Sequence, residues 1–139
     1  MNIIDVDAII DYLREKVAES SNEILEDLRN WKIFSELPIQ ENSNLVLVVS
    51  SFPPVVESEV SKILTIRCSL FGGKAEYPDT KLVKILEYLT EILTNNYSWN
   101  VPDFGFWVYK IAEAGWSPWM IDEKWRNIRV KDFYLYYTV

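Results

Sequence analysis

Neighbouring carboxylates are the residues of this sequence whose types and spacing come closest to catalytic chemistry. Two carboxyl groups whose pKa values are split by their surroundings can act as acid and base in glycoside or phosphoryl chemistry. Such pairs occur at Asp5/Asp7, Glu26/Asp27 and Asp122/Glu123. All three lie in polar segments, where acidic side chains are normally solvated. None of them alone predicts an active site.

The pair Asp122/Glu123 is flanked by Trp119 and Trp125. Two aromatic rings beside two acids outline a carbohydrate-stacking site, so an enzyme that uses this segment is one functional alternative.

Other catalytic signatures are missing. The sequence contains no histidine, which removes the commonest general base near neutral pH and the commonest zinc ligand. It has no glycine-rich phosphate loop, nucleophile elbow or cysteine cluster. The single cysteine, Cys68, lies in an alternating apolar segment and is expected to be a buried, unreactive thiol. We therefore expect a protein that is not an enzyme and binds no cofactor or metal.

Charge is unevenly distributed along the chain. The net charge is −7, and residues 1–43 hold ten acidic and four basic residues. Such an acidic segment argues against wrapping of nucleic acid, which needs clustered Lys and Arg. The one basic run, residues 124–131, is expected to be a solvated face or a partner for the acidic region of a neighbouring copy. No apolar run of eighteen residues and no basic leader occurs, so we expect no membrane association.

Two segments show helical spacing of apolar residues. The first covers residues 5–19, with Asp5 as N-cap and a second helical stretch over 23–31. The other covers residues 78–96, where Pro78, Asp79 and Thr80 provide the start.

Strand patterns occupy residues 45–51, 61–72, 104–115 and 129–139. At 139 residues the chain is expected to form one domain, residues 1–139. The order predicts an α+β fold: one or two N-terminal helices and a small antiparallel sheet of about four strands in β-β-α-β-β order, with the helices packed on one face.

The last strand is unusually aromatic. Strand alternation places Phe133, Leu135 and Tyr137 on one face, which we interpret as core, and Tyr134 and Tyr136 on the other. The second face is too aromatic for an ordinary solvated one, and we expect either a neighbouring subunit or the domain's own helices to cover it.

Three stretches together resemble the tail terminator, or tail completion, proteins of long-tailed bacteriophages. They are "TIRCSL" at 65–70, the helix start Asp79-Thr80, and "DFYLYY" at 132–137. Asp122, Glu123 and Arg126 also match an acidic–arginine element that this family has before its last strand. The family often has Gly between these acids and the Arg, where this sequence has Lys124-Trp125.

The resemblance implies a non-enzymatic virion protein at the head-proximal end of the tail, assembled in the host cytoplasm. Proteins of this family form a homo-oligomeric ring, typically six-fold, that caps the tail tube protein and then receives the head–tail connector protein. DNA would pass the lumen without specific binding, which suits an acidic chain.

Seven residues are candidates for the subunit or tube interface. They are Asp122, Glu123, Trp125, Arg126, Arg129, Tyr134 and Tyr136. A rival from another class is an acidic inhibitor or immunity protein that blocks a basic partner, supported by the charge of residues 1–43.

Overall fold

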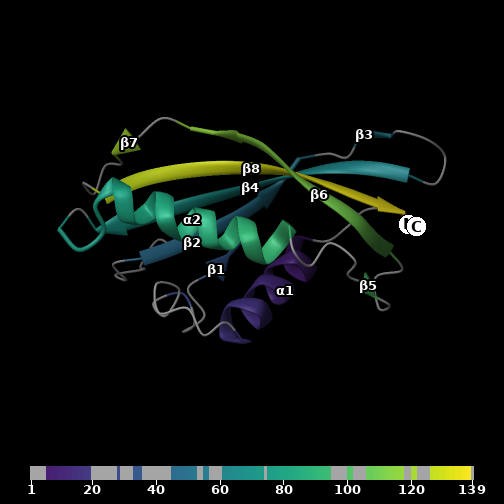
Figure 1. Ribbon diagram of the computed structural model, residues 1–139, viewed down its shortest axis with the longest axis horizontal. Helices are drawn as coiled ribbons and strands as arrows, with labels where there is room; N and C mark the ends of the chain where they lie inside the picture. Colours follow the sequence, from purple (N-terminus) through teal and green to yellow (C-terminus); the bar gives the residue numbers. More distant parts are fainter. Residues whose placement is uncertain are drawn as a thin grey trace.

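Two helices and eight strands make up the described part of the chain (Figure 1). The computed structural model describes residues 6–19, 28, 33–35, 45–52, 55–56, 61–73, 75–94, 100–101, 106–117, 120–121 and 126–138. The helices are α1 (Val6–Glu19) and α2 (Asp79–Thr94). The long strands are β2 (Leu45–Ser51), β4 (Ser61–Gly73), β6 (Phe106–Trp116) and β8 (Arg126–Thr138), and the two-residue strands are β1 (Ile33–Phe34), β3 (Val55–Val56), β5 (Asn100–Val101) and β7 (Met120–Ile121).

The strands form one mixed sheet, so the predicted fold class is wrong. Six strands follow the order β1-β2-β4-β8-β6-β5, while β3 pairs with β4 and β7 with β8. All pairs are antiparallel except β1–β2, which is parallel. We expected about four antiparallel strands; the four additional strands have two residues each and carry no hydrophobic period that a sequence could reveal.

The aromatic C-terminal strand lies inside the sheet rather than at its edge. β8 pairs with β4 over its whole length and with β6 on its other side. The view in Figure 1 shows this strand, in yellow, between its two neighbours. Most of its backbone groups are therefore hydrogen-bonded within the chain.

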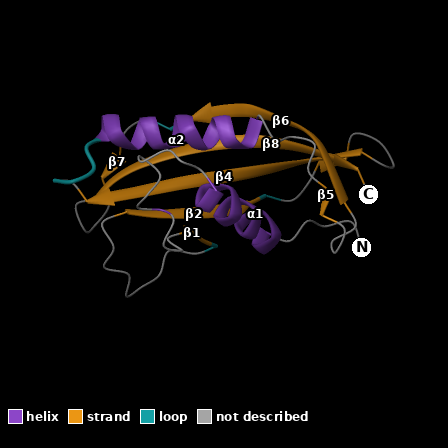
Figure 2. Cartoon of the chain, turned by 60° about the horizontal axis from the view of Figure 1, so that its bottom comes forward, coloured by secondary structure: helices purple, strands orange, loops and turns teal. Residues whose placement is uncertain are grey.

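Both helices pack on the same side of the sheet, which we call the helix face (Figures 1 and 2). α2 contacts β4, β6 and β8, and α1 contacts β1 and β2. The sheet residues buried beneath them alternate along β2, β4 and β8, and a bulge interrupts the alternation in β6. They are Leu45, Leu47, Val49, Leu64, Ile66, Cys68, Leu70, Val108, Ile111, Phe133, Leu135 and Tyr137.

The helices meet this face with the apolar stripes that their sequences contain. In α1 the buried residues Ile9, Leu13 and Val17 recur every four positions, and acidic residues occupy the exposed side. In α2 the buried stripe consists of Leu82, Ile85, Leu86, Leu89 and Leu93. The predicted helices at 5–19 and 78–96 are confirmed, with ends that differ by one or two residues.

Gly72 lets the start of α2 lie close to β4. A Cβ at this position would stand 2.5 Å from the Tyr77 Cβ and 2.8 Å from the Leu82 Cδ2. The segment between them is fastened by hydrogen bonds, because the Tyr77 N–H donates to the Gly73 carbonyl at 2.8 Å and the Asn127 side chain donates to the Tyr77 carbonyl at 2.8 Å. Only glycine fits between β4 and this turn.

Some predictions fall outside the described residues. They include the second helical stretch over 23–31, apart from Leu28, the N-cap Asp5, and the residues Trp119, Asp122, Glu123 and Trp125.

Candidate interaction surface

The opposite side of the sheet, which we call the open face, carries the candidate site. Neither described helix packs against it. Strand alternation and the pairing register place these side chains on it: Ile63, Thr65, Arg67, Ser69 and Phe71 of β4, Lys110 and Ala112 of β6, and Ile128, Val130, Asp132, Tyr134 and Tyr136 of β8.

Large apolar side chains are exposed on this face. Phe52, Tyr109, Met120 and Tyr134 have exposed fractions between 37% and 41%. Tyr134 lies near the middle of the sheet, with Thr65 of β4 and Ala112 of β6 as its cross-strand neighbours. Small partners on both sides leave the Tyr134 ring accessible, whereas an ordinary solvated sheet face carries mostly polar side chains.

Polar contacts hold the aromatic side chains at one end of the face in place. The Tyr109 ring lies 6.2 Å from the Tyr136 ring, and its hydroxyl is 2.7 Å from the Ser61 hydroxyl. The Lys110 ammonium stands 5.0 Å from the centre of the Tyr136 ring. These contacts restrict the rings, and such restriction lowers the entropy that side chains lose when they are buried in an interface.

A charged pair occupies the middle of the open face. Arg67 donates from Nε and from a terminal nitrogen to the two carboxylate oxygens of Asp132, at 2.9 and 3.0 Å. Its guanidinium also lies 4.9 Å from the centre of the Phe52 ring. The hydrogen bond to Asp132 raises the pKa of Arg67, so this side chain stays charged at any working pH.

The same pair borders a shallow depression of about 290 Å³. Met120 and Val130 supply apolar lining, and Gly115 and Ser117 form part of its wall. The depression therefore combines apolar surface with an internally neutralised ion pair. This mixture is common at protein–protein contacts.

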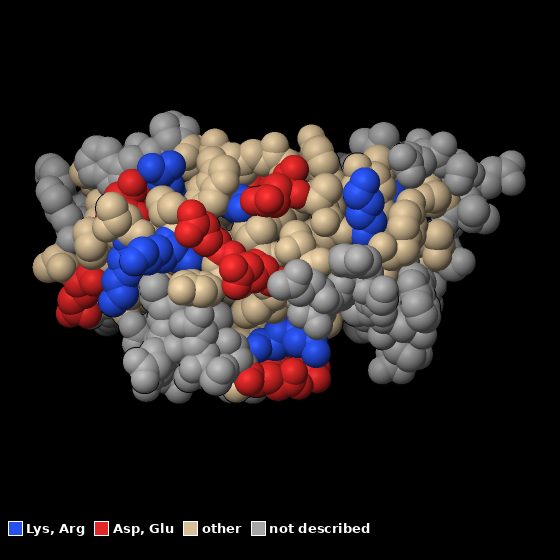
Figure 3. All heavy atoms as spheres, in the orientation of Figure 1, with Lys and Arg blue, Asp and Glu red and all other residues tan. Residues whose placement is uncertain are grey.

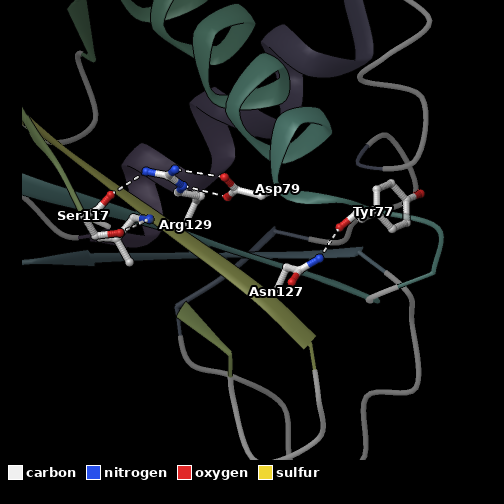
Figure 4. Close-up of polar contacts among 6 residues, drawn as sticks. Tyr77, Asp79, Ser117, Asn127 and Arg129 are labelled. Atoms are coloured by element: carbon white, nitrogen blue, oxygen red, sulfur yellow. Dashed lines mark hydrogen bonds and ion pairs between the residues drawn. The ribbon is translucent and has the colours of Figure 1, made fainter. Parts of the chain in front are cut away.

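The basic run behaves differently from the prediction of a solvated patch. Arg129 points to the helix face, where it forms two hydrogen bonds to the Asp79 carboxylate, at 2.7 and 2.9 Å, and one to the Ser117 carbonyl at 2.7 Å (Figure 4). The hydrogen bonds from Arg129 lower the pKa of Asp79. Arg129 thus joins the first turn of α2 to the sheet, where an acid also favours the helix dipole.

The other described cations of this run also have partners within the chain. Lys131 is buried and donates to the Thr90 hydroxyl at 2.7 Å and to the Glu113 carboxylate. The buried Arg126 lies 5.3 Å from the centre of the Phe71 ring. The described cations of the basic run therefore make their contacts within the subunit.

The structure brings only some of the predicted interface residues together. Tyr134, Tyr136 and Arg126 belong to the open face by register, whereas Arg129 belongs to the helix face. Their part in an interface stays a prediction. Five residues of this surface were not predicted from the sequence: Phe52, Arg67, Tyr109, Lys110 and Met120. Alternation in β4 did place Arg67 on the polar side of that strand. Nothing in the sequence indicated that Asp132 would lie opposite it.

Tyr134 does not pack under the helices of its own domain. That alternative from the sequence is wrong, because the helices cover the opposite face and Tyr134 is exposed.

The described residues carry few signs of catalytic chemistry. They contain no cluster of His, Cys, Asp or Glu that could hold a metal ion. Cys68 is buried as predicted, and burial, followed by the nearby Asp132 charge, raises the pKa of its thiol to about 12. Such a thiol is a poor nucleophile at neutral pH.

Comparisons with known proteins add no assignment: no protein-family model matches the chain, and no curated protein matches it either. Within the described ranges, no helix is both long enough and apolar enough to cross a membrane.

Proposed function

We propose that this chain is a structural subunit of the bacteriophage tail terminator type, which associates with copies of itself into a ring and caps a tail tube. The observation that carries the proposal is the exposure of Tyr134 at the centre of the open face, with further exposed apolar side chains around it. Large, rigid aromatic side chains of this kind supply contact area at low entropic cost when a partner buries them.

The two-sided construction supports this role. A ring subunit needs accessible surface for its neighbours; α1 and α2 cover the helix face, whereas neither of these described helices packs on the open face, where Tyr109 and Tyr134 are exposed. The three stretches that carry the family resemblance lie on connected elements, since the strand 65–70 pairs with β8 and Asp79 is bound by Arg129.

The proposal is tested by the mass of the assembled protein. Light scattering is measured on the purified chain alone and then mixed with the tail tube protein encoded closest to it, and the mixture is imaged by electron microscopy. We expect a closed ring, or a ring at the end of each tube. A chain that stays monomeric and ignores tube protein would contradict the proposal.

A second candidate function is an acidic inhibitor that binds a basic partner. It is favoured by the exposed acidic row on α1, formed by Asp7, Asp11, Glu15 and Glu19. This candidate predicts a monomer that captures a basic protein at low salt and releases it as salt is raised. The same light-scattering experiment separates the two functions.

A further inference from the structure

The exposed side of α1 is acidic, whereas the open face carries an excess of basic side chains. This difference in charge suggests which surfaces of two copies bind each other. Asp7, Asp11, Glu15 and Glu19 are spaced by four residues, so they form one exposed ridge along the helix. We call these four residues the acidic ridge. Figure 3 shows an acidic band at the rim of the molecule over α1, with a basic band beside it.

The two basic residues of α1 neutralise the ridge only in part. The side chains of Asp11 and Glu19 are 73% and 58% exposed, against 24% for Arg14 and 28% for Lys16. Arg14 donates to the Ile33 carbonyl, and the Lys16 ammonium lies 5.6 Å from the centre of the Tyr12 ring. Arg14 and Lys16 also lie 3.9 Å from the Asp11 carboxylate and 3.5 Å from the Glu19 carboxylate, respectively. The four acids still exceed these two cations, so the ridge keeps a negative charge.

The open face carries the opposite sign. Arg126 is buried, so the described charged side chains at its surface are Arg67 and Lys110 against the single acid Asp132, an excess of one positive charge. Lys110 is exposed, and Arg67 is more exposed than the carboxylate that it binds. Apolar rings surround these cations, so a partner with an acidic surface would gain both charge complementarity and buried aromatic area.

Resting on the proposed function, we infer that copies associate head to tail, with the acidic ridge of α1 of one copy docked on the open face of the next. Two open faces in contact would bring Lys110 and Arg67 of both copies together and would leave the acidic ridges unused. A contact between two different surfaces also propagates around a ring, whereas a contact of one surface with itself ends at a dimer.

Charge reversal on each side tests the inference. One variant carries Lys110→Glu and the other carries Asp11→Lys with Glu15→Lys. In a head-to-tail contact, either variant alone brings like charges together. We therefore expect the association constant of each variant to be at least tenfold lower than that of wild type. Sedimentation at low salt measures it, with tube protein added if wild type needs it for assembly. An equimolar mixture restores opposite charges at every contact of an alternating ring and should recover the wild-type mass.

Matched controls exist on α2. Lys84→Glu repeats the Lys110 change, and Glu87→Lys with Glu91→Lys repeats the change on α1; all three control positions are exposed on this helix. We expect both controls to assemble as wild type. The melting temperature of every variant is measured so that unfolding is distinguished from lost association.

Other outcomes overturn the inference in recognisable ways. If wild type assembles and both variants assemble equally well, head-to-tail docking through these surfaces is wrong while the proposed function stands. If Lys110→Glu strengthens association and the α1 variant has no effect, open faces meet each other. If wild type itself never assembles, with or without tube protein, the proposed function fails and the inference fails with it.

Discussion

Successive side chains of β8 enter two different environments. Phe133, Leu135 and Tyr137 are buried under the helices, whereas Tyr134 is exposed on the other side of the same strand. On the helix face the apolar residues interlock with α1 and α2. On the open face Tyr109 and Tyr134 stay exposed. The core cluster of the described residues therefore lies on one face of the sheet.

Each face also contains an arginine that binds a carboxylate with two hydrogen bonds. The side chains of Arg129 and Asp79 are 21% and 30% exposed, against 43% and 23% for Arg67 and Asp132. Arg129 also donates to the Ser117 carbonyl, so it connects three segments of the chain. Arg67 links two neighbouring strands that already pair with each other. The helix-side pair has the larger structural role.

The largest expected difference in stability is between alanine substitutions at two adjacent residues of β8. Phe133→Ala removes a fully buried ring and should cost about 3–5 kcal/mol in the free energy of unfolding. Tyr134→Ala removes an exposed ring and should cost less than about 1 kcal/mol. Urea denaturation of both variants measures the difference, and similar losses would mean that the two faces are not distinct. Phe133→Leu serves if the alanine variant does not fold.

Two glycines give the next largest contrast. Gly72→Ala places a Cβ against Tyr77 and Leu82, and overpacking of this kind should cost about 1–3 kcal/mol. A Cβ at Gly115, beside the depression on the open face, meets nothing within 4 Å, so Gly115→Ala should change stability by less than about 0.5 kcal/mol. Thermal unfolding of the two variants checks this prediction. Equal melting temperatures would show that α2 does not lie this close to β4.

The two arginines should differ in the same direction by a smaller amount. Arg129→Ala leaves Asp79 and the Ser117 carbonyl without this donor, and we expect a loss of about 1–3 kcal/mol. Arg67→Ala breaks a more exposed pair and should cost about 0–1 kcal/mol. Chemical denaturation at low and high salt gives both values. A larger loss for Arg67→Ala would reverse the proposed division between the faces.

The smallest expected effect is a pH dependence on the helix side. Because Arg129 lowers the pKa of Asp79 below its ordinary value of 3.8, the ionised carboxylate stabilises the folded state. This stabilisation is fully present above the unfolded pKa and is lost as pH falls toward the folded pKa. The difference in unfolding free energy between wild type and Asp79→Asn should therefore shrink from about pH 5 to about pH 2. A difference that stays constant over this range would show that the pair is not formed.

Local sequence patterns predicted the long elements because their periods reflect burial. Alternation in β4 and β8 separated buried from exposed residues, and the stripe of α2 identified its core side. The short strands could not be found in this way. β1, for example, is a strand only because Ile33 and Phe34 pair with β2, and no local pattern encodes its parallel direction.

The candidate surface was only partly predictable for a related reason. Tyr134 and Tyr136 follow from alternation, but Arg129 meets Asp79 across fifty positions of sequence. The bulge between Val108 and Lys110 also shifts the register of β6, so simple alternation does not place Tyr109. Which cations form ion pairs within the subunit depends on contacts between elements that are distant in the sequence.

The most direct test of the account is the association of a Tyr134→Lys variant. Sedimentation measures its association constant beside wild type, with tube protein added if wild type requires it, and thermal unfolding measures its stability. Burial of Tyr134 by a neighbouring subunit predicts an association constant at least tenfold lower with an almost unchanged melting temperature. Wild-type association by this variant, with its fold intact, would contradict the claim that the open face is the interface.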